Sequence, residues 1–154
     1  MADKNYLRLD KVAATDHYES VKAGEVLVNG QFVELGKADL TDGIEVMNIV
    51  KTEEGKAAEA VIAQAHLDYG YLDFDYAKAS VAPGKIARAL VLHKGQMLSF
   101  NAENATGIAA GDDVAVAADG MGIKKAAAEE VVIGKCIRLD YLANIGDLVV
   151  IRVK

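Results

Sequence analysis

Several residue types that commonly carry structure or chemistry are scarce in this chain. A single cysteine, Cys136, excludes an internal disulfide and a cysteine-based zinc site. Tryptophan is absent, and the one proline is Pro83. Apolar runs fall short of the roughly 18 residues that a membrane-spanning helix needs, so we expect no membrane span. The charged opening, MADKNYLRLD, lacks the apolar stretch of a secretion signal, so we expect an intracellular product.

Positive charge is also in deficit. The chain has 17 Lys and Arg against 23 Asp and Glu, which gives a net charge of −6 at pH 7. Because a negative surface repels nucleic-acid phosphates, we do not expect this protein to bind DNA or RNA.

Motifs of reaction chemistry are missing as well. The sequence has no Walker A loop, no dinucleotide fingerprint, no nucleophile elbow and no H-E-x-x-H. The three histidines, His17, His66 and His93, show no ligand-like spacing, so they do not predict a metal site. Cys136 lies in an apolar run, which favours an inert buried thiol. We therefore expect no enzymatic activity, no cofactor and no metal.

One phrase occurs twice in the sequence. Residues 23–36 read AGEVLVNGQFVELG and residues 110–124 read AGDDVAVAADGMGIK. Each has an Ala-Gly-acid opening, a β-rich run, a turn that ends in Gly and a second run. Asn29-Gly30 and Asp119-Gly120 are typical of hairpin turns. Internal duplication and chance explain the repeat about equally well, and both predict two β-hairpins.

The first 20 residues lack steady apolar periodicity, so we predict an extended N-terminal arm over residues 1–20. Leu7 and Leu9 alternate with polar residues, which indicates a short strand. That strand could add to the sheet edge of another chain, or it could close a sheet of this protein.

Residues 21–154 are predicted to form a single, mainly β domain built from hairpins, with one or two short helices. A chain of 154 residues can bury a substantial core. Residues 51–66 combine alanines with an alternating pattern, which favours a short helix that runs into a strand. The last strands are expected at 131–141 and 147–153.

The segment LDYGYLDFDY, residues 67–76, has an unusual acidic and aromatic composition. Its carboxylates are Asp68, Asp73 and Asp75, and His66 lies just before the segment. These groups suggest a calcium site, acid and base chemistry or another small-ligand site. Its tyrosines could instead contact a partner. The composition favours a further alternative, in which the aromatics pack on the protein's own core.

The sequence resembles a known family in two stretches. These are AGEVLVNGQFVELG near the start, and AGDDVAVAADGMGI followed by the ending VVIGKCIRLDYLANIGDLVVIRVK. Together they resemble the capsid decoration, or cement, proteins of tailed bacteriophages. The resemblance covers roughly residues 20–36 and 107–154, and the segment at 67–76 departs from it.

The resemblance implies a small β-barrel or tulip-like body on the outer surface of the phage head, where it strengthens the shell against DNA pressure. It also implies the major capsid protein as partner, a homotrimer, and a virion location after assembly in the host cytoplasm. We expect partner contacts at Tyr6, Leu7, Arg8, Leu9, Tyr69 and Tyr71. The alternatives are another virion accessory protein, or a small β-barrel ligand-binding module or enzyme that uses residues 66–76.

Overall fold

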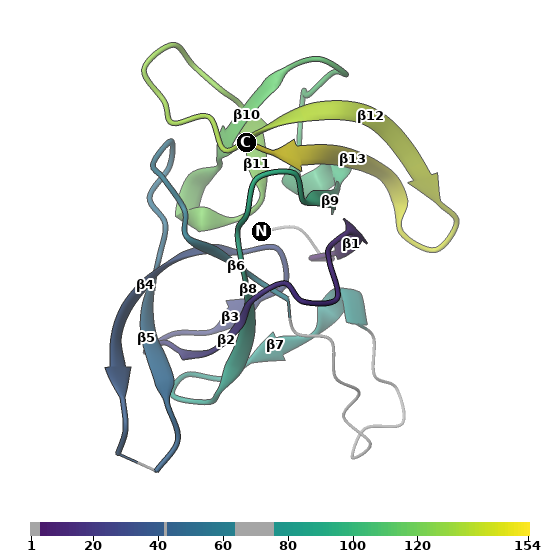
Figure 1. The fold of residues 1–154 in the computed structure, drawn as a ribbon. Helices are drawn as coiled ribbons and strands as arrows, with labels where there is room; N and C mark the ends of the chain where they lie inside the picture. The colour runs from purple at the N-terminus through teal and green to yellow at the C-terminus, as the bar shows by residue number, and fades with distance from the viewer. Residues whose placement is uncertain (1–3, 42, 64–75) are drawn as a thin grey trace.

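The computed structural model describes residues 4–41, 43–63 and 76–154 (Figure 1). It is mainly β and combines a six-stranded sheet, a closed five-stranded barrel and a two-stranded ladder. In Figure 1 the six-stranded sheet occupies the upper part of the molecule and the barrel lies below it. The expected mainly β fold with a small barrel is therefore confirmed.

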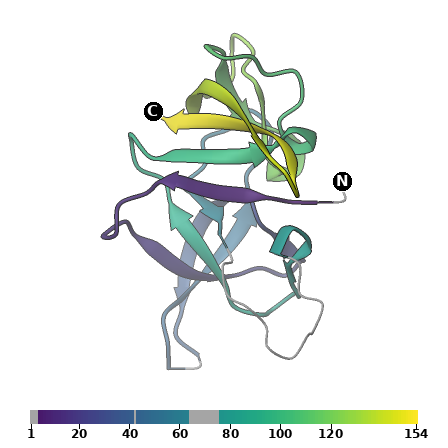
Figure 2. The same cartoon turned by 90° about the vertical axis from the view of Figure 1, so that its right-hand side faces the viewer.

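The six-stranded sheet is antiparallel at every strand pair, so its neighbours run in opposite directions. It includes the C-terminal strands and one strand from the N-terminal region (Figure 2). In spatial order the strands are β1 (Leu7–Lys11), β9 (Met97–Asn101), β13 (Gly146–Val153), β12 (Gly134–Leu142), β10 (Asp113–Val116) and β11 (Ile123–Lys125).

The barrel closes through one parallel pair, β2 with β5, and four antiparallel pairs. Its strands in spatial order are β2 (Tyr18–Lys22), β5 (Val46–Lys51), β4 (Phe32–Asp39), β6 (Ala60–Ile62) and β8 (Ala87–Val91). The remaining elements are the ladder of β3 (Leu27–Val28) with β7 (Ser80–Val81) and the short 3-10 helices η1 (Tyr76–Lys78), η2 (Ala102–Asn104) and η3 (Ala118–Gly120).

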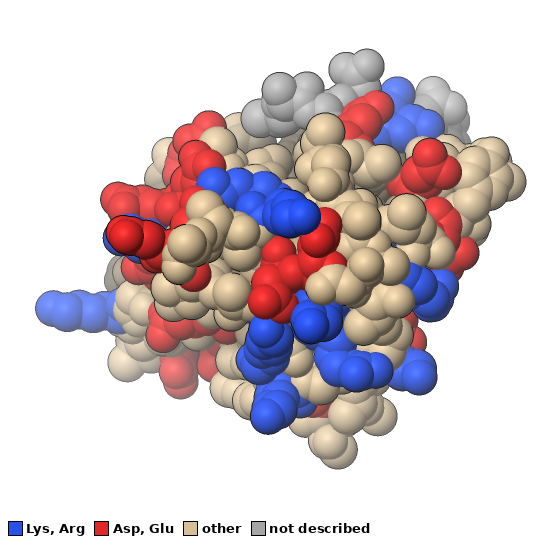
Figure 3. Space-filling view, turned by 90° about the horizontal axis from the view of Figure 1, so that it is seen from above, with Lys and Arg blue, Asp and Glu red and all other residues tan. Residues whose placement is uncertain are grey.

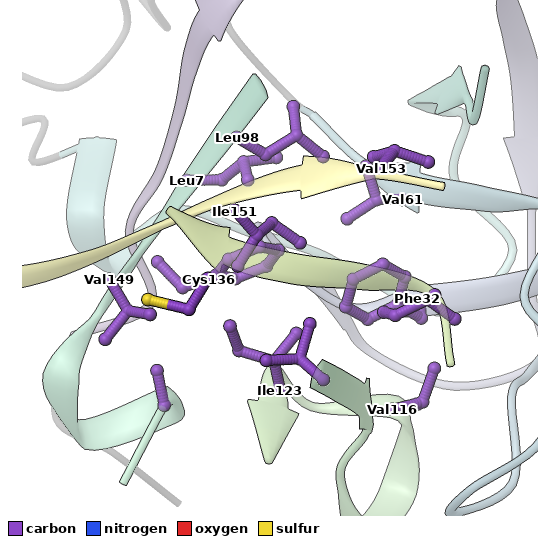
Figure 4. Packing of buried hydrophobic residues seen from close by; sticks show 14 of the residues in the cluster. Leu7, Phe32, Val61, Leu98, Val116, Ile123, Cys136, Val149, Ile151 and Val153 are labelled. Carbon is purple, nitrogen blue, oxygen red and sulfur yellow. The ribbon is translucent and has the colours of Figure 1, made fainter. Parts of the chain in front are cut away.

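Barrel strands β4, β6 and β8 each contribute to two hydrophobic cores. Phe32, Val61 and Leu90 belong to the large core that they share with the six-stranded sheet (Figure 4). Their neighbours along the same strands, including Val33 and Ile62, belong to the core inside the barrel. This follows from the alternation of side chains along a strand, which sends successive residues to opposite faces.

One aromatic contact joins the barrel to the sheet across the large core. The ring of Phe32 on β4 stacks on that of Phe100 on β9, with centroids 5.5 Å apart, and both residues are fully buried. Stacked aromatic pairs add about 0.5–1.5 kcal/mol to the stabilisation from burial. The barrel and the six-stranded sheet are therefore in direct contact through these two rings.

The second copy of the repeated phrase forms the predicted hairpin. Strands β10 and β11 pair antiparallel, and the loop between them contains η3, with positive φ at both Asp119 and Gly120. The extra residues of this copy widen the turn, as the sequence indicates.

The first copy does not form a hairpin, which corrects the prediction. Strand β3 pairs with β7, whereas β4 pairs with β5 and β6. The turn itself is present, because the Gln31 N–H donates to the Val28 carbonyl at 3.3 Å and Gly30 has a φ of +82°. Asn29 does not have positive φ, and a type I′ hairpin turn requires it at both central positions. The two strands therefore diverge.

The arm predicted over residues 1–20 is also corrected, within the described part. Strand β1 pairs with β9 at the edge of the six-stranded sheet, and β2 closes the barrel against β5 and β8. The alternative reading, a strand that closes a sheet of this protein, is the one that holds. The predicted domain boundary at residues 20 and 21 falls inside β2.

The short helix expected within residues 51–66 does not form in the described part of that segment. Residues 52–59 are turns and irregular chain, and β6 follows at once. Because Ala60, Val61 and Ile62 are all fully buried between the two cores, tertiary packing outweighs the helix propensity of the alanines.

Candidate partner interface

The residues predicted to contact a partner lie in different environments. Leu7 is 2% exposed and belongs to the large core, and Leu9 packs against that core. Tyr6 is partly buried, with its ring edge-on to Tyr76 at a centroid distance of 5.8 Å. The Leu7 side chain is therefore part of this protein's own core, and the predicted partner contact by residues 6–9 stays a prediction.

The acidic and aromatic segment falls outside the described residues for nearly all of its length. This applies to both tyrosines proposed as partner contacts and to all of the groups proposed for a ligand site: Tyr69, Tyr71, His66, Asp68, Asp73 and Asp75. Among the described residues, no group of three or more His, Cys, Asp and Glu side chains is arranged to hold a metal ion.

Arg8 links β1 to the far strand of the C-terminal hairpin. Its guanidinium pairs with Asp10 on its own strand and with Asp140 on β12, the latter at 2.7 Å. Arg138 adds a second contact to the same Asp140 carboxylate at 2.8 Å. The hydrogen bond from Arg8, followed by that from Arg138, holds the pKa of the Asp140 carboxyl well below its usual range.

Polar contacts also fix the chain that precedes β1. The side chain of Asn101 accepts the Tyr6 N–H at 3.1 Å and donates to the Lys4 carbonyl at 2.8 Å. The Tyr76 hydroxyl donates to the Leu7 carbonyl at 3.2 Å, and burial raises the pKa of Tyr76 to about 12. The N-terminal segment from residue 4 onward is therefore held in the fold.

The β12–β13 hairpin projects beyond the rest of its sheet. Strands β12 and β13 pair as far as Leu142 and Gly146, but β9 supports β13 only from Leu148 onward. Tyr141, opposite Asp147, lies on the projecting part and is 64% exposed, and Leu139, just before it on β12, is 57% exposed. Large apolar and aromatic side chains in such a position are candidates for contact with another molecule.

A cleft lies between this hairpin and the chain around η2. Its volume is about 370 Å³, and apolar side chains contribute much of its wall. The lining residues are Ala102, Ala105, Thr106, Gly107, Ile108, Leu139, Asp140, Asp147, Leu148 and Val149. We refer to this cleft, together with Leu139 and Tyr141, as the hairpin surface.

Sequence reasoning missed the hairpin surface. The sequence feature that could have indicated this surface is the stretch RLDYL, in which Leu139 and Tyr141 alternate with charged residues. This alternation places both side chains on one face of a strand. Their exposure depends on how far the neighbouring strands β9 and β10 extend beside the hairpin, and the local sequence of β12 does not contain that information.

Two further hollows lie within the described part of the chain. One, of about 730 Å³, lies on the barrel and is lined by a mixture of Glu, Lys, Val and Ala side chains. The other, of about 210 Å³, lies beside the C-terminus and includes Leu92, Val131 and Ile133.

Cys136 is fully buried, as predicted, and burial raises the pKa of its thiol. No helix in the described ranges is long and apolar enough to cross a membrane.

Comparison with known proteins gives a match among solved structures. No family model and no curated protein matches this chain. Among solved structures, it is similar to the crystal structure of the head fiber gp8.5 N base in bacteriophage phi29. The TM-score is 0.55 at 14% sequence identity, and the alignment covers 90% of this chain and 93% of that chain. At this identity, the similarity shows a shared fold.

Proposed function

We propose that this protein is a structural accessory component of a phage virion, which binds the outer surface of the head shell and stabilises it against the pressure of the packaged DNA. The observation that carries the proposal is the fold shared with the base of the phi29 head fiber along 90% of this chain. The sequence resemblance to capsid decoration proteins supports the same assignment.

The proposed partner is the major capsid protein, and the proposed assembly is a homotrimer. The protein acts in the virion after assembly in the host cytoplasm, without catalysis and without a cofactor. Many copies on one shell bind with avidity, so the individual interface can be modest in size.

We assign the shell contact to the hairpin surface. Tyr141 offers a rigid ring with a polar tip, on the same face of β12 as Leu139. Tyr and Arg are enriched among residues that dominate binding energy, particularly beside a pocket that excludes water. The cleft next to Leu139 is lined largely by apolar residues and would receive an apolar side chain of the shell.

Cryo-electron microscopy of particles made with and without this chain tests the function. The genome that encodes the chain is used, with its gene intact or deleted. We expect additional density on the outer face of the shell only in particles that contain the protein, and earlier DNA release on heating in particles without it. Density confined to the tail or to the inside of the shell, or no density at all, would overturn the proposal.

The contact surface is tested by adding purified variants back to the particles without the gene product. The double variant Leu139→Ser with Tyr141→Ser should bind about tenfold more weakly, since truncation of an interface hot spot typically costs more than 1 kcal/mol. The control is Val50→Ser, which alters a side chain that is 62% exposed on the barrel. Equal loss of binding in both variants would show that the hairpin surface is not the contact.

A further inference from the structure

A row of cations crosses the outer face of the six-stranded sheet. Lys135 on β12 lies opposite Arg152 on β13, Arg152 lies opposite Met97 on β9, and Met97 lies opposite Lys11 on β1. The row therefore contains three cations in register across four neighbouring strands. We call Lys11, Arg152 and Lys135 the basic row.

Two members of the basic row, Lys135 and Arg152, repel each other. Directly opposed side chains on neighbouring strands have Cβ atoms about 4.5–5.5 Å apart, and like charges in that position are destabilising. Lys135 and Arg152 are such a pair. The arrangement costs stability in the isolated molecule, and carboxylates of a bound partner would relieve the repulsion.

The fold neutralises the basic row only at one end. Asp113 lies 4.0 Å from Lys135, and the same carboxylate pairs with Lys154 at 2.8 Å. Arg152 and Lys11 are exposed, and neither forms an ion pair with any residue in the described ranges. By contrast, Arg8 on the same sheet is matched by two carboxylates.

The row stands out because the whole chain is acidic. The net charge is −6, and the view from above in Figure 3 shows Lys and Arg side chains gathered toward its lower edge, with Asp and Glu side chains spread over the rest of the view and beside them. Cations without matching carboxylates create a local positive potential on a molecule that otherwise repels anions.

We propose that the basic row binds an acidic protein surface, whose Asp and Glu carboxylates pair with Lys11, Arg152 and Lys135. The inference rests on the proposed function, for which it names the chemistry of the partner. A protein partner fits better than a nucleic acid because Asp113 lies next to the Lys135 end of the row and the net charge of −6 opposes a phosphate backbone. A carboxylate surface needs only short-range complementarity to a few cations.

Binding of poly-L-glutamate to the purified full chain tests the proposal without particles. The test variant is Lys135→Glu with Arg152→Glu. The matched control is Lys56→Glu with Lys85→Glu, which changes the net charge equally at two exposed positions in loops of the barrel half. Affinity is measured at low salt and again at about 0.3 M salt, where charges are screened within roughly 6 Å.

We expect the wild type and the control to bind with similar affinity and the test variant to bind about tenfold more weakly, with binding lost at high salt. Equal weakening in both variants, or no binding by the wild type at low salt, would overturn the inference. Tighter binding to duplex DNA than to poly-L-glutamate, if lost in the test variant, would also overturn it.

Sedimentation of the chain alone distinguishes an acidic partner from a second copy of this protein. The basic row should have no influence on self-association, so wild type and test variant should sediment alike. Dissociation caused by the test variant would assign the row to contacts between copies and overturn the proposal. None of these results depends on whether the protein occurs on a virion, so failure here and failure of the proposed function are separable.

Discussion

At the scale of single residues, Gly122 and Gly84 share a backbone conformation but differ in their surroundings. Their φ angles are +74° and +73°. A Cβ atom at Gly122 would lie 2.1 Å from the carbonyl oxygen of Asn104, whereas a Cβ atom at Gly84 would meet nothing within 4 Å. The pair therefore separates the cost of a left-handed backbone from the cost of close approach between two chain segments.

We predict that Gly84→Ala lowers the free energy of unfolding by about 1–2 kcal/mol, which is the strain of a left-handed alanine. Gly122→Ala should add roughly 1–3 kcal/mol for displacement of the packed backbone around Asn104. Urea denaturation measures both values. An equal decrease in the free energy of unfolding of the two variants would show that the close approach of Gly122 to Asn104 does not contribute to the cost of the substitution.

A second residue-scale prediction concerns Asp140, whose pKa is lowered in the folded state by Arg8 and Arg138. A carboxyl with a depressed folded-state pKa stabilises the fold above its unfolded pKa of about 3.9, and this contribution is lost as the pH falls through the folded-state pKa. Asp140→Asn should therefore reduce stability at pH 7, and its deficit should shrink steadily below about pH 4.

Chemical denaturation from pH 7 to pH 2 measures this effect. Asp147→Asn serves as the control, because Asp147 is exposed on the same hairpin. A deficit of Asp140→Asn that stays constant across the whole pH range would contradict the assigned role of the ion pairs.

At the scale of elements, the two copies of the repeated phrase show what local sequence can determine. Both contain a turn where one is predicted, since Gly30 and Gly120 supply the positive φ that their turns need. Only the second copy pairs its own flanking strands. In the first, β4 pairs with β5 and β6 in place of β3, and its Phe32 stacks on Phe100 of β9 across the large core.

The N-terminal elements illustrate the same division. The alternation of Leu7 and Leu9 predicts a strand, and β1 is that strand. Its partner, β9, lies about 90 residues later in the chain, so the local pattern cannot distinguish a free arm from a strand within a sheet. Deletion of residues 2–10 would remove most of this strand together with Leu7, and so it would not be a clean test of partner binding.

The candidate interface was less predictable than the fold. Sequence reasoning selected Tyr6, Leu7, Arg8 and Leu9, of which Leu7 is buried and Arg8 is held by two carboxylates. Exposure of Leu139 and Tyr141 and alignment of Lys135 with Arg152 arise from strand register. Register is a property of pairs of distant strands, set by which faces are buried in the folded molecule.

At the scale of the whole molecule, the shared strands decide how the barrel and the six-stranded sheet unfold. Loss of the sheet would expose Phe32, Val61 and Leu90 on one face of β4, β6 and β8 while their other faces stayed inside the barrel. Full burial of such side chains contributes about 1.5–3 kcal/mol each, so the barrel alone would lose a large part of its stability. We therefore predict a single cooperative unfolding transition.

Hydrogen exchange at increasing urea concentration, followed by mass spectrometry, can resolve the two halves. Peptides from β5 report on the barrel, and peptides from β13 report on the sheet. Phe100→Leu removes part of the stacked pair on the sheet side, and it should shift both sets of peptides to lower urea by the same amount. The control Val50→Ala should shift neither, because exposed substitutions usually change stability by less than about 0.5 kcal/mol. If the β13 peptides shift while those of β5 keep their midpoint, the barrel is an independent folding unit and the large core does not couple the two halves.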